Sequence, residues 1–151
     1  MPKSRRTQVN TVPSTSGHNI LLLSCMDLRL LDEIVDYMDG RNLTNRYDHV
    51  ILAGAALGVV HAAHGHWAKT FWDHLALARE LHEVSEVHIL EHRECGAYRK
   101  LLGLDFANDP EAERRKHAEA AHALETLIGL QHPDLTVRGF LMELDGQVSP
   151  L

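Results

Sequence analysis

Short apolar runs alternate with amphipathic segments along this chain of 151 residues. Residues 20–24, 50–53 and 87–90 form three apolar runs, which is the pattern of strands buried on both faces of a parallel sheet. A fourth strand is predicted at residues 135–144. The Asp145-Gly146 turn signal then precedes a last short strand.

Helical spacing of apolar residues fills the intervals between these runs. One helix is predicted from Leu30 to Gly40, a longer one over residues 67–81, and a short one after Gly96. The dipeptide Asp109-Pro110 is typical of a helix start, and that helix should continue to about residue 130. The charged positions at residues 111–116 and at Glu119 fit a solvated face of this helix.

Strands that alternate with helices predict an α/β fold with a mostly parallel central sheet flanked by helices. We expect the strand order 2-1-3-4, with the short C-terminal strand added antiparallel. Residues 1–18 are polar and contain no acidic residue, which predicts a flexible N-terminal tail. Residues 19–151 have the length of a single domain.

Charge and hydropathy exclude two classes of partner. The net charge of −6 argues against nucleic acid, whose binding proteins carry a basic excess. No apolar run approaches the roughly 20 residues that cross a bilayer, so no membrane partner is expected. With no secretion signal and only two cysteines, the sequence predicts a cytoplasmic protein.

Both cysteines follow apolar runs. Cys25 comes directly after residues 20–24, and Cys95 stands three residues beyond His92, which follows residues 87–90. In the expected strand order these two strands are neighbours, so the three side chains meet at one crevice. Two thiolates and an imidazole make a three-ligand Zn²⁺ set whose fourth position stays open, as in catalytic sites. A disulfide or two buried thiols are the alternatives.

Asp27 and Arg29 follow Cys25 at alternate positions. On extended chain Asp27 projects to the same side as Cys25, where a carboxylate can orient a zinc-bound hydroxide. It can also serve as the fourth metal ligand in a closed form of the site. Arg29 can pair with Asp27 through its planar guanidinium. The alternative interpretation makes Asp27 the N-cap of the following helix and Arg29 a surface charge.

Two segments, Cys25-Met26-Asp27-Leu28-Arg29 and His92-Arg93-Glu94-Cys95-Gly96, resemble the signature motifs of the β-class carbonic anhydrases. The resemblance implies zinc on Cys25, His92 and Cys95, with Asp27 and Arg29 as the catalytic dyad. It implies reversible hydration of carbon dioxide to bicarbonate by a zinc-bound hydroxide that the dyad orients. It also implies a homodimer with the active site near the subunit interface, or a dimer of dimers.

The chain departs from the family pattern close to the expected pocket. The family usually has an Arg-Asn-Ala-Gly-like stretch after its second strand, whereas residues 51–58 here are small and apolar. Glu91 replaces the glycine that commonly precedes the zinc histidine. An apolar wall suits a small linear molecule, so carbonyl sulfide and carbon disulfide, which relatives within this fold hydrolyse, are alternative substrates. A non-catalytic zinc-binding homologue is the remaining alternative.

Overall fold

A five-stranded sheet forms the centre of the computed structural model, which describes residues 18–151. The strand order is β2-β1-β3-β4-β5; the first four strands are parallel and β5 is antiparallel to β4, as predicted. The strands are β1 (Asn19–Ser24), β2 (Tyr47–Ile51), β3 (Val84–His92), β4 (Thr136–Met142) and β5 (Val148–Pro150). Apart from His18, the predicted tail lies outside the described residues.

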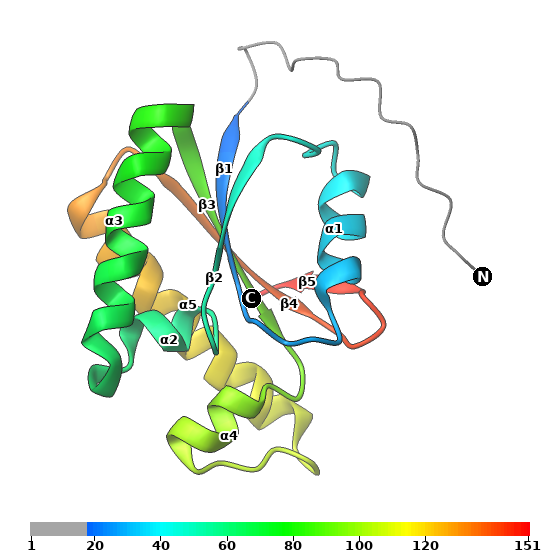
Figure 1. The fold of residues 1–151 in the computed structure, drawn as a ribbon. Coiled ribbons are helices and arrows are strands. Elements are labelled where there is room, and N and C mark those ends of the chain that lie inside the picture. The colour runs from blue at the N-terminus through cyan, green and yellow to red at the C-terminus, as the bar shows by residue number, and fades with distance from the viewer. Residues whose placement is uncertain (1–17) are drawn as a thin grey trace.

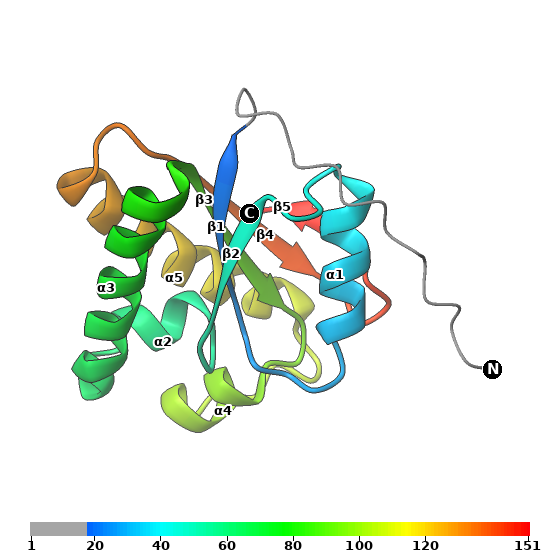
Figure 2. The same ribbon diagram turned by 45° about the horizontal axis from the view of Figure 1, so that its top comes forward.

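Helices cover the two faces of this sheet unequally. Three of them, α2 (Ala56–Val60), α3 (Gly65–His82) and α5 (Pro110–Gln131), lie on one face, and α1 (Leu31–Gly40) lies on the other (Figures 1 and 2). The short helix α4 (Gly96–Leu102) lies beyond the carboxyl ends of β1 and β3. In the part of the chain that the structure describes, no helix combines the length and apolar character needed to cross a membrane.

The continuous apolar run in β1 is explained by burial on both faces of the sheet. Leu21 and Leu23 belong to the larger core, which they form with side chains of α3 and α5. Leu22 points to the opposite face and packs against α1. Because successive side chains alternate across a strand, a strand covered on both faces needs apolar residues at every position. The partners on the helices are Phe71, Leu75, Leu124 and Ile128 on one face, and Ile34 and Met38 on the other.

The second strand begins earlier than the sequence pattern predicted. It spans Tyr47–Ile51 rather than residues 50–53. It also ends earlier, because the chain turns after Ile51, where the amide of Ala55 donates to the carbonyl of Leu52 at 2.9 Å. Gly54 and Ala55 both have positive φ, 78° and 49°, so the segment after the strand is a turn and not extended chain. The polar start of β2 is tolerated because this strand is at the edge of the sheet.

The predicted start of α5 is confirmed in detail. The side chain of Asp109 accepts a hydrogen bond from the amide of Ala112 at 2.9 Å, and Pro110 occupies the first turn. The Asp145-Gly146 turn is also confirmed, with Gly146 at a φ of 89° between β4 and β5. Both features connect elements that surround the candidate site.

One glycine substitution tests the packing of α2, and another in α5 serves as its control. A Cβ at Gly58 would lie 2.4 Å from the carbonyl oxygen of Ala53, so we expect Gly58→Ala to lower the free energy of unfolding by about 1–3 kcal/mol. Gly129 lies in α5 with no heavy atom within 4 Å of the added carbon, so Gly129→Ala should raise it by about 0.5–1 kcal/mol. Urea unfolding measures both. Equal stability of Gly58→Ala and wild type would contradict this packing.

Candidate metal centre

The structure brings Cys25, His92 and Cys95 together at the carboxyl ends of two neighbouring strands. Cys25 follows β1, His92 is the last residue of β3, and Cys95 is the N-cap of α4. One ligand atom from each residue lies within 4.8 Å of the other two. The two sulfur atoms are 3.9 Å apart and both cysteines are free, so the alternative of a disulfide is wrong.

The two thiols ionise unequally because they lie in contact. The hydrogen bond between them lowers the pKa of Cys25 to about 4, and the amide of Gly54, which donates to its sulfur at 3.3 Å, acts in the same direction. The same contact raises the pKa of Cys95, and burial adds to that rise. The backbone amides of Ala97 and Tyr98 lower the pKa of Cys95 and partly offset this rise. Two adjoining sulfurs supplied with backbone donors are suited to hold a cation.

His92 is oriented so that one ring nitrogen faces the two sulfurs without a partner. Its Nδ1 donates to the carbonyl oxygen of Arg93 at 2.7 Å, which leaves the lone pair on Nε2. Nε2 is buried and makes no hydrogen bond with any residue of the described chain. Burial lowers the pKa of His92, but Cys25, the carbonyl of Arg93 and the Asp27 charge together raise that pKa above its usual value.

These donors fit a zinc ion. An unpaired buried nitrogen is costly, and a cation between Nε2 and the two sulfurs would remove that cost. Soft thiolate sulfur together with imidazole nitrogen is a donor set that zinc favours. A histidine ligand whose other ring nitrogen donates to a carbonyl is also the usual arrangement in metal sites. The residues present are therefore compatible with the predicted zinc.

Asp27 and Arg29 form a two-point ion pair at the mouth of the centre. The Nε and Nη2 atoms of Arg29 donate to the two carboxylate oxygens of Asp27 at 3.0 and 2.8 Å. Together with the Arg29 amide, they lower the pKa of Asp27 to about 2. The second carboxylate oxygen lies 3.8 Å from Nε2 of His92, so this pair belongs to the same site.

The helix-capping interpretation of Asp27 is wrong. The N-cap of α1 is Leu30, and no side chain caps that helix. Instead, Asp27 accepts from the amide of Arg29 at 2.9 Å in a turn that precedes the helix. The carboxylate therefore faces the metal centre rather than the amides of α1.

A large open cleft lies beside the candidate metal centre and is lined by two of its three residues, Cys25 and Cys95. Its volume is about 1280 Å³, and both Cys25 and Asp27 are in its lining. Several apolar side chains complete the wall: Met26, Leu28, Ala53, Trp67, Leu101 and Phe106. Met26 and Leu28 are 70% and 92% exposed in the single chain. The cleft combines an apolar wall with a polar centre at its base.

Comparison with known proteins decides the family. A family model described as "Putative carbonic anhydrase" matches residues 15–151. The chain belongs to this carbonic anhydrase family. Two relatives resemble it over 131 residues, or 87% of this chain. An uncharacterized protein of Rickettsia bellii is 37% identical, with 80% of its length covered. One of Rickettsia conorii is 38% identical, with 70% covered.

Solved structures place the fold among the β-carbonic anhydrases. The wild-type enzyme CafD of Aspergillus fumigatus superposes with a TM-score of 0.56 at 16% identity, covering 90% of each chain. A tetrameric β-carbonic anhydrase of Sordaria macrospora gives a TM-score of 0.54 at 14% identity, covering 89% of this chain and 80% of that one. The resemblance inferred from the two motifs thus agrees with the family and with the fold.

The sequence pattern did not predict a buried contact between Glu91 and Tyr98 behind the candidate metal centre. Glu91, which precedes His92, is 1% exposed, and one of its carboxylate oxygens accepts a hydrogen bond from the hydroxyl of Tyr98. Burial raises the pKa of Tyr98, and the Glu91 charge adds to the rise. The ring of His117 packs on the Tyr98 ring, with centroids 4.1 Å apart. This contact fixes α4, which begins next to Cys95, against the end of β3.

Removal of the Tyr98 hydroxyl tests the strength of that contact. Tyr98→Phe leaves a buried carboxylate without its donor, so the free energy of unfolding should fall by about 1–3 kcal/mol. Tyr47→Phe is the control, because Tyr47 is only half-buried at the start of the edge strand β2; its effect should stay within about 0.5 kcal/mol. Urea unfolding measures both, and equal losses would refute the role given to the buried contact.

Proposed function

We propose that this protein catalyses the reversible hydration of carbon dioxide to bicarbonate on a zinc ion held by Cys25, His92 and Cys95. The observation that carries the proposal is the unpaired, buried Nε2 of His92, which faces two free thiols beside the Asp27–Arg29 pair. Membership of the carbonic anhydrase family supports the same reaction.

The ligand set determines what chemistry the metal can supply. Zinc bound by two thiolates and one imidazole would keep a fourth position open and lower the pKa of a water there toward about 7. The protein's part is to hold the sulfur of Cys25 through the amide of Gly54, to favour the thiolate of Cys95 through the nearby amides of Ala97 and Tyr98, and to keep the imidazole of His92 in the correct tautomer.

Asp27 is suited to orient the attacking water. With a pKa of about 2 it is ionised at neutral pH and can only accept a hydrogen bond, so it directs the oxygen lone pair toward the substrate. Arg29 holds both carboxylate oxygens and thereby fixes the direction of that acceptor. Arg29 uses one lone pair on each carboxylate oxygen and balances its charge, so we propose that Asp27 accepts a hydrogen bond through a remaining lone pair rather than binding zinc as a fourth ligand.

The apolar wall favours a small linear substrate without charge. Ala53, from the stretch where the family usually has polar residues, lines the cleft together with Trp67, and both give an uncharged substrate apolar contact surface. Carbonyl sulfide and carbon disulfide share this shape and polarity, which makes their hydrolysis the second candidate. Release of sulfide from either compound, without carbon dioxide hydration by the same preparation, would favour the second candidate.

Loss of one ligand tests the proposed site. In Cys95→Ala only two protein ligands remain, so we expect zinc content to fall well below one per chain and hydration of carbon dioxide to drop at least about 100-fold. Zinc is measured by atomic emission and hydration by stopped flow with a pH indicator. Unchanged activity in this variant would overturn the proposed site. Wild type that binds zinc but turns over none of the three substrates would favour the non-catalytic alternative.

Asp27→Asn separates orientation from metal binding. The amide keeps the size of the side chain but loses the charge, so zinc content should stay near wild type while kcat falls by roughly 10²–10⁴-fold. Asp36→Asn is the control, because Asp36 is an exposed acid on α1 outside the cleft. If the two variants were equally active, Asp27 would have no orienting role.

The exposed apolar side chains at the cleft mouth support an oligomer. We expect the protein to have two or four times the chain mass of 17.0 kDa in light scattering. A charge at the 92% exposed Leu28 should weaken an interface there. Leu28→Lys should therefore lower the mass, whereas Leu130→Lys, at a 76% exposed position near the end of α5, should not. A monomeric wild type would refute the assembly.

A further inference from the structure

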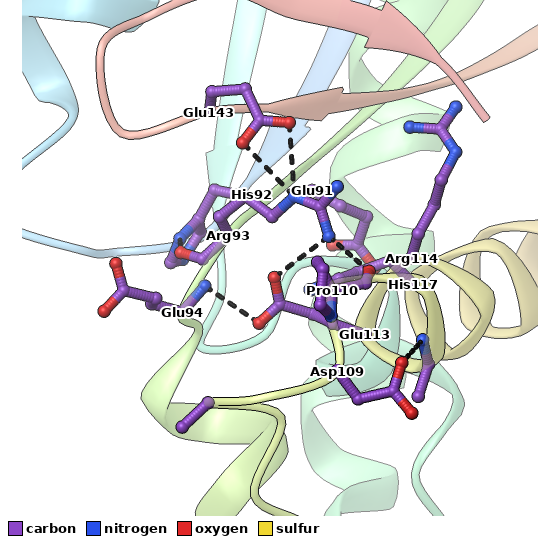
Figure 3. Close-up of polar contacts among 12 residues, drawn as sticks. Glu91, His92, Arg93, Glu94, Asp109, Pro110, Glu113, Arg114, His117 and Glu143 are labelled. Atoms are coloured by element: carbon purple, nitrogen blue, oxygen red, sulfur yellow. Dashed lines mark hydrogen bonds and ion pairs between the residues drawn. The ribbon is translucent and has the colours of Figure 1, made fainter.

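Glu113 on α5 is buried beside the loop that connects His92 with Cys95. The sequence pattern placed it on a solvated helix face, but it is only 7% exposed. Figure 3 shows its carboxylate reaching from α5 toward Arg93 and the backbone nitrogen of Glu94. One oxygen accepts from Nη1 of Arg93 at 3.3 Å, and the other accepts from the amide of Glu94 at 3.2 Å.

The peptide group between Arg93 and Glu94 connects Glu113 to a proposed metal ligand. Its carbonyl oxygen, on Arg93, accepts from Nδ1 of His92 at 2.7 Å. Its amide, on Glu94, donates to Glu113. A carboxylate at the amide end fixes the peptide plane and makes the carbonyl a better acceptor, because linked hydrogen bonds polarise one another. The orientation of the His92 ring is therefore coupled to a carboxylate on another helix.

The backbone at Glu94 shows why this peptide needs external support. Glu94 adopts a left-handed conformation with a φ of 55°, which is unfavourable for a residue with a side chain. Glu113 holds its amide, and Nη2 of Arg29 donates to its carbonyl oxygen at 3.2 Å. The same strained residue is thus held from one side by α5 and from the other by the cation that pairs with Asp27.

We propose that Glu113 is a positioning residue that orients His92 for zinc through the peptide between Arg93 and Glu94. In many metal sites a carboxylate accepts directly from the ligand histidine. Here the carboxylate acts one peptide further away, and the carbonyl of Arg93 makes the direct contact. The inference rests on the proposed zinc role of His92 and adds a residue from α5 to the support of that ligand.

The competing explanation is that Glu113 only balances the charge of Arg93. Arg93 has a second carboxylate partner, because its Nε lies 3.2 Å from both oxygens of Glu143, and it also donates to the carbonyl of Pro110 at 2.7 Å. Glu143 touches Arg93 without touching the peptide of Glu94. Neutralising Glu143 therefore removes charge balance alone, whereas truncating Glu113 also removes the acceptor of the Glu94 amide.

The first measurement is zinc affinity, by competition with a chromophoric chelator, on the full chain. Loss of a partner behind a ligand typically weakens metal binding about 10- to 100-fold, so we expect about 10-fold weaker binding in Glu113→Ala. Glu113→Gln keeps an oxygen for the Glu94 amide and should lose less. Glu143→Gln and Glu111→Gln, an exposed acid in the same first turn of α5, should bind zinc within about twofold of wild type.

The second measurement follows the His92 ring without metal. NMR of protein labelled with ¹⁵N-histidine should show a protected, downfield Nδ1 proton in wild type, Glu143→Gln and Glu111→Gln. In Glu113→Ala this signal should shift and exchange faster with water, and in Glu113→Gln it should shift less. Because Glu113→Gln is nearly isosteric, it decides the question if the alanine variant does not fold.

The outcomes are distinguishable. Wild-type zinc affinity and an unchanged Nδ1 signal in both Glu113 variants would overturn the proposal, and so would an equal loss in Glu143→Gln. Wild type that binds zinc but does not hydrate carbon dioxide would contradict the proposed reaction and leave this inference intact. If wild type bound no zinc, the proposed function would fail, and the signal in metal-free protein would still decide whether Glu113 orients the ring.

Discussion

The parallel pairing of β1 with β3 is the constraint on which the candidate centre depends. Ser24 lies opposite Leu90, so the chain leaves β1 at Cys25 close to His92 at the end of β3. Cys95 needs no such long-range pairing, because it follows His92 within one turn. A one-residue slip between these strands would reverse the faces of their side chains, so the packing of both cores also fixes the distance between Cys25 and His92.

Backbone groups supply hydrogen bonds to two of the three candidate ligands. The amide of Gly54 donates to the sulfur of Cys25, and the carbonyl of Arg93 accepts from the imidazole of His92. Nearly every residue has an amide and a carbonyl, so these hydrogen bonds do not depend on the type of side chain. They depend on the position and orientation of the backbone. Side chains at a greater distance hold that backbone: Arg29 and Glu113 at the loop, and Glu91 with Tyr98 behind it.

The elements that are marked by one clear local sequence pattern were predictable from the sequence. The apolar run of β1, the cap of α5 and the turn after β4 each follow from local chemistry, and the ligand set follows from strand order. The limits of β2 were not predictable in this way, because its polar residues are tolerated only at a sheet edge. Glu113 resembled its solvated neighbours in the helical pattern, and only the tertiary fold places it against the loop at Glu94.

The two outer strands of the sheet affect how copies of this chain can meet. At one edge, β5 has three residues and ends at Pro150, which has no amide hydrogen to donate. At the other edge, β2 carries Asp48, whose carboxylate is engaged by the His82 ring at 2.7 Å. Short strands, proline and charged side chains all discourage pairing with a foreign strand. Neither margin favours extension of the sheet, so an assembly of this chain would have to use side chains on the helices and around the cleft.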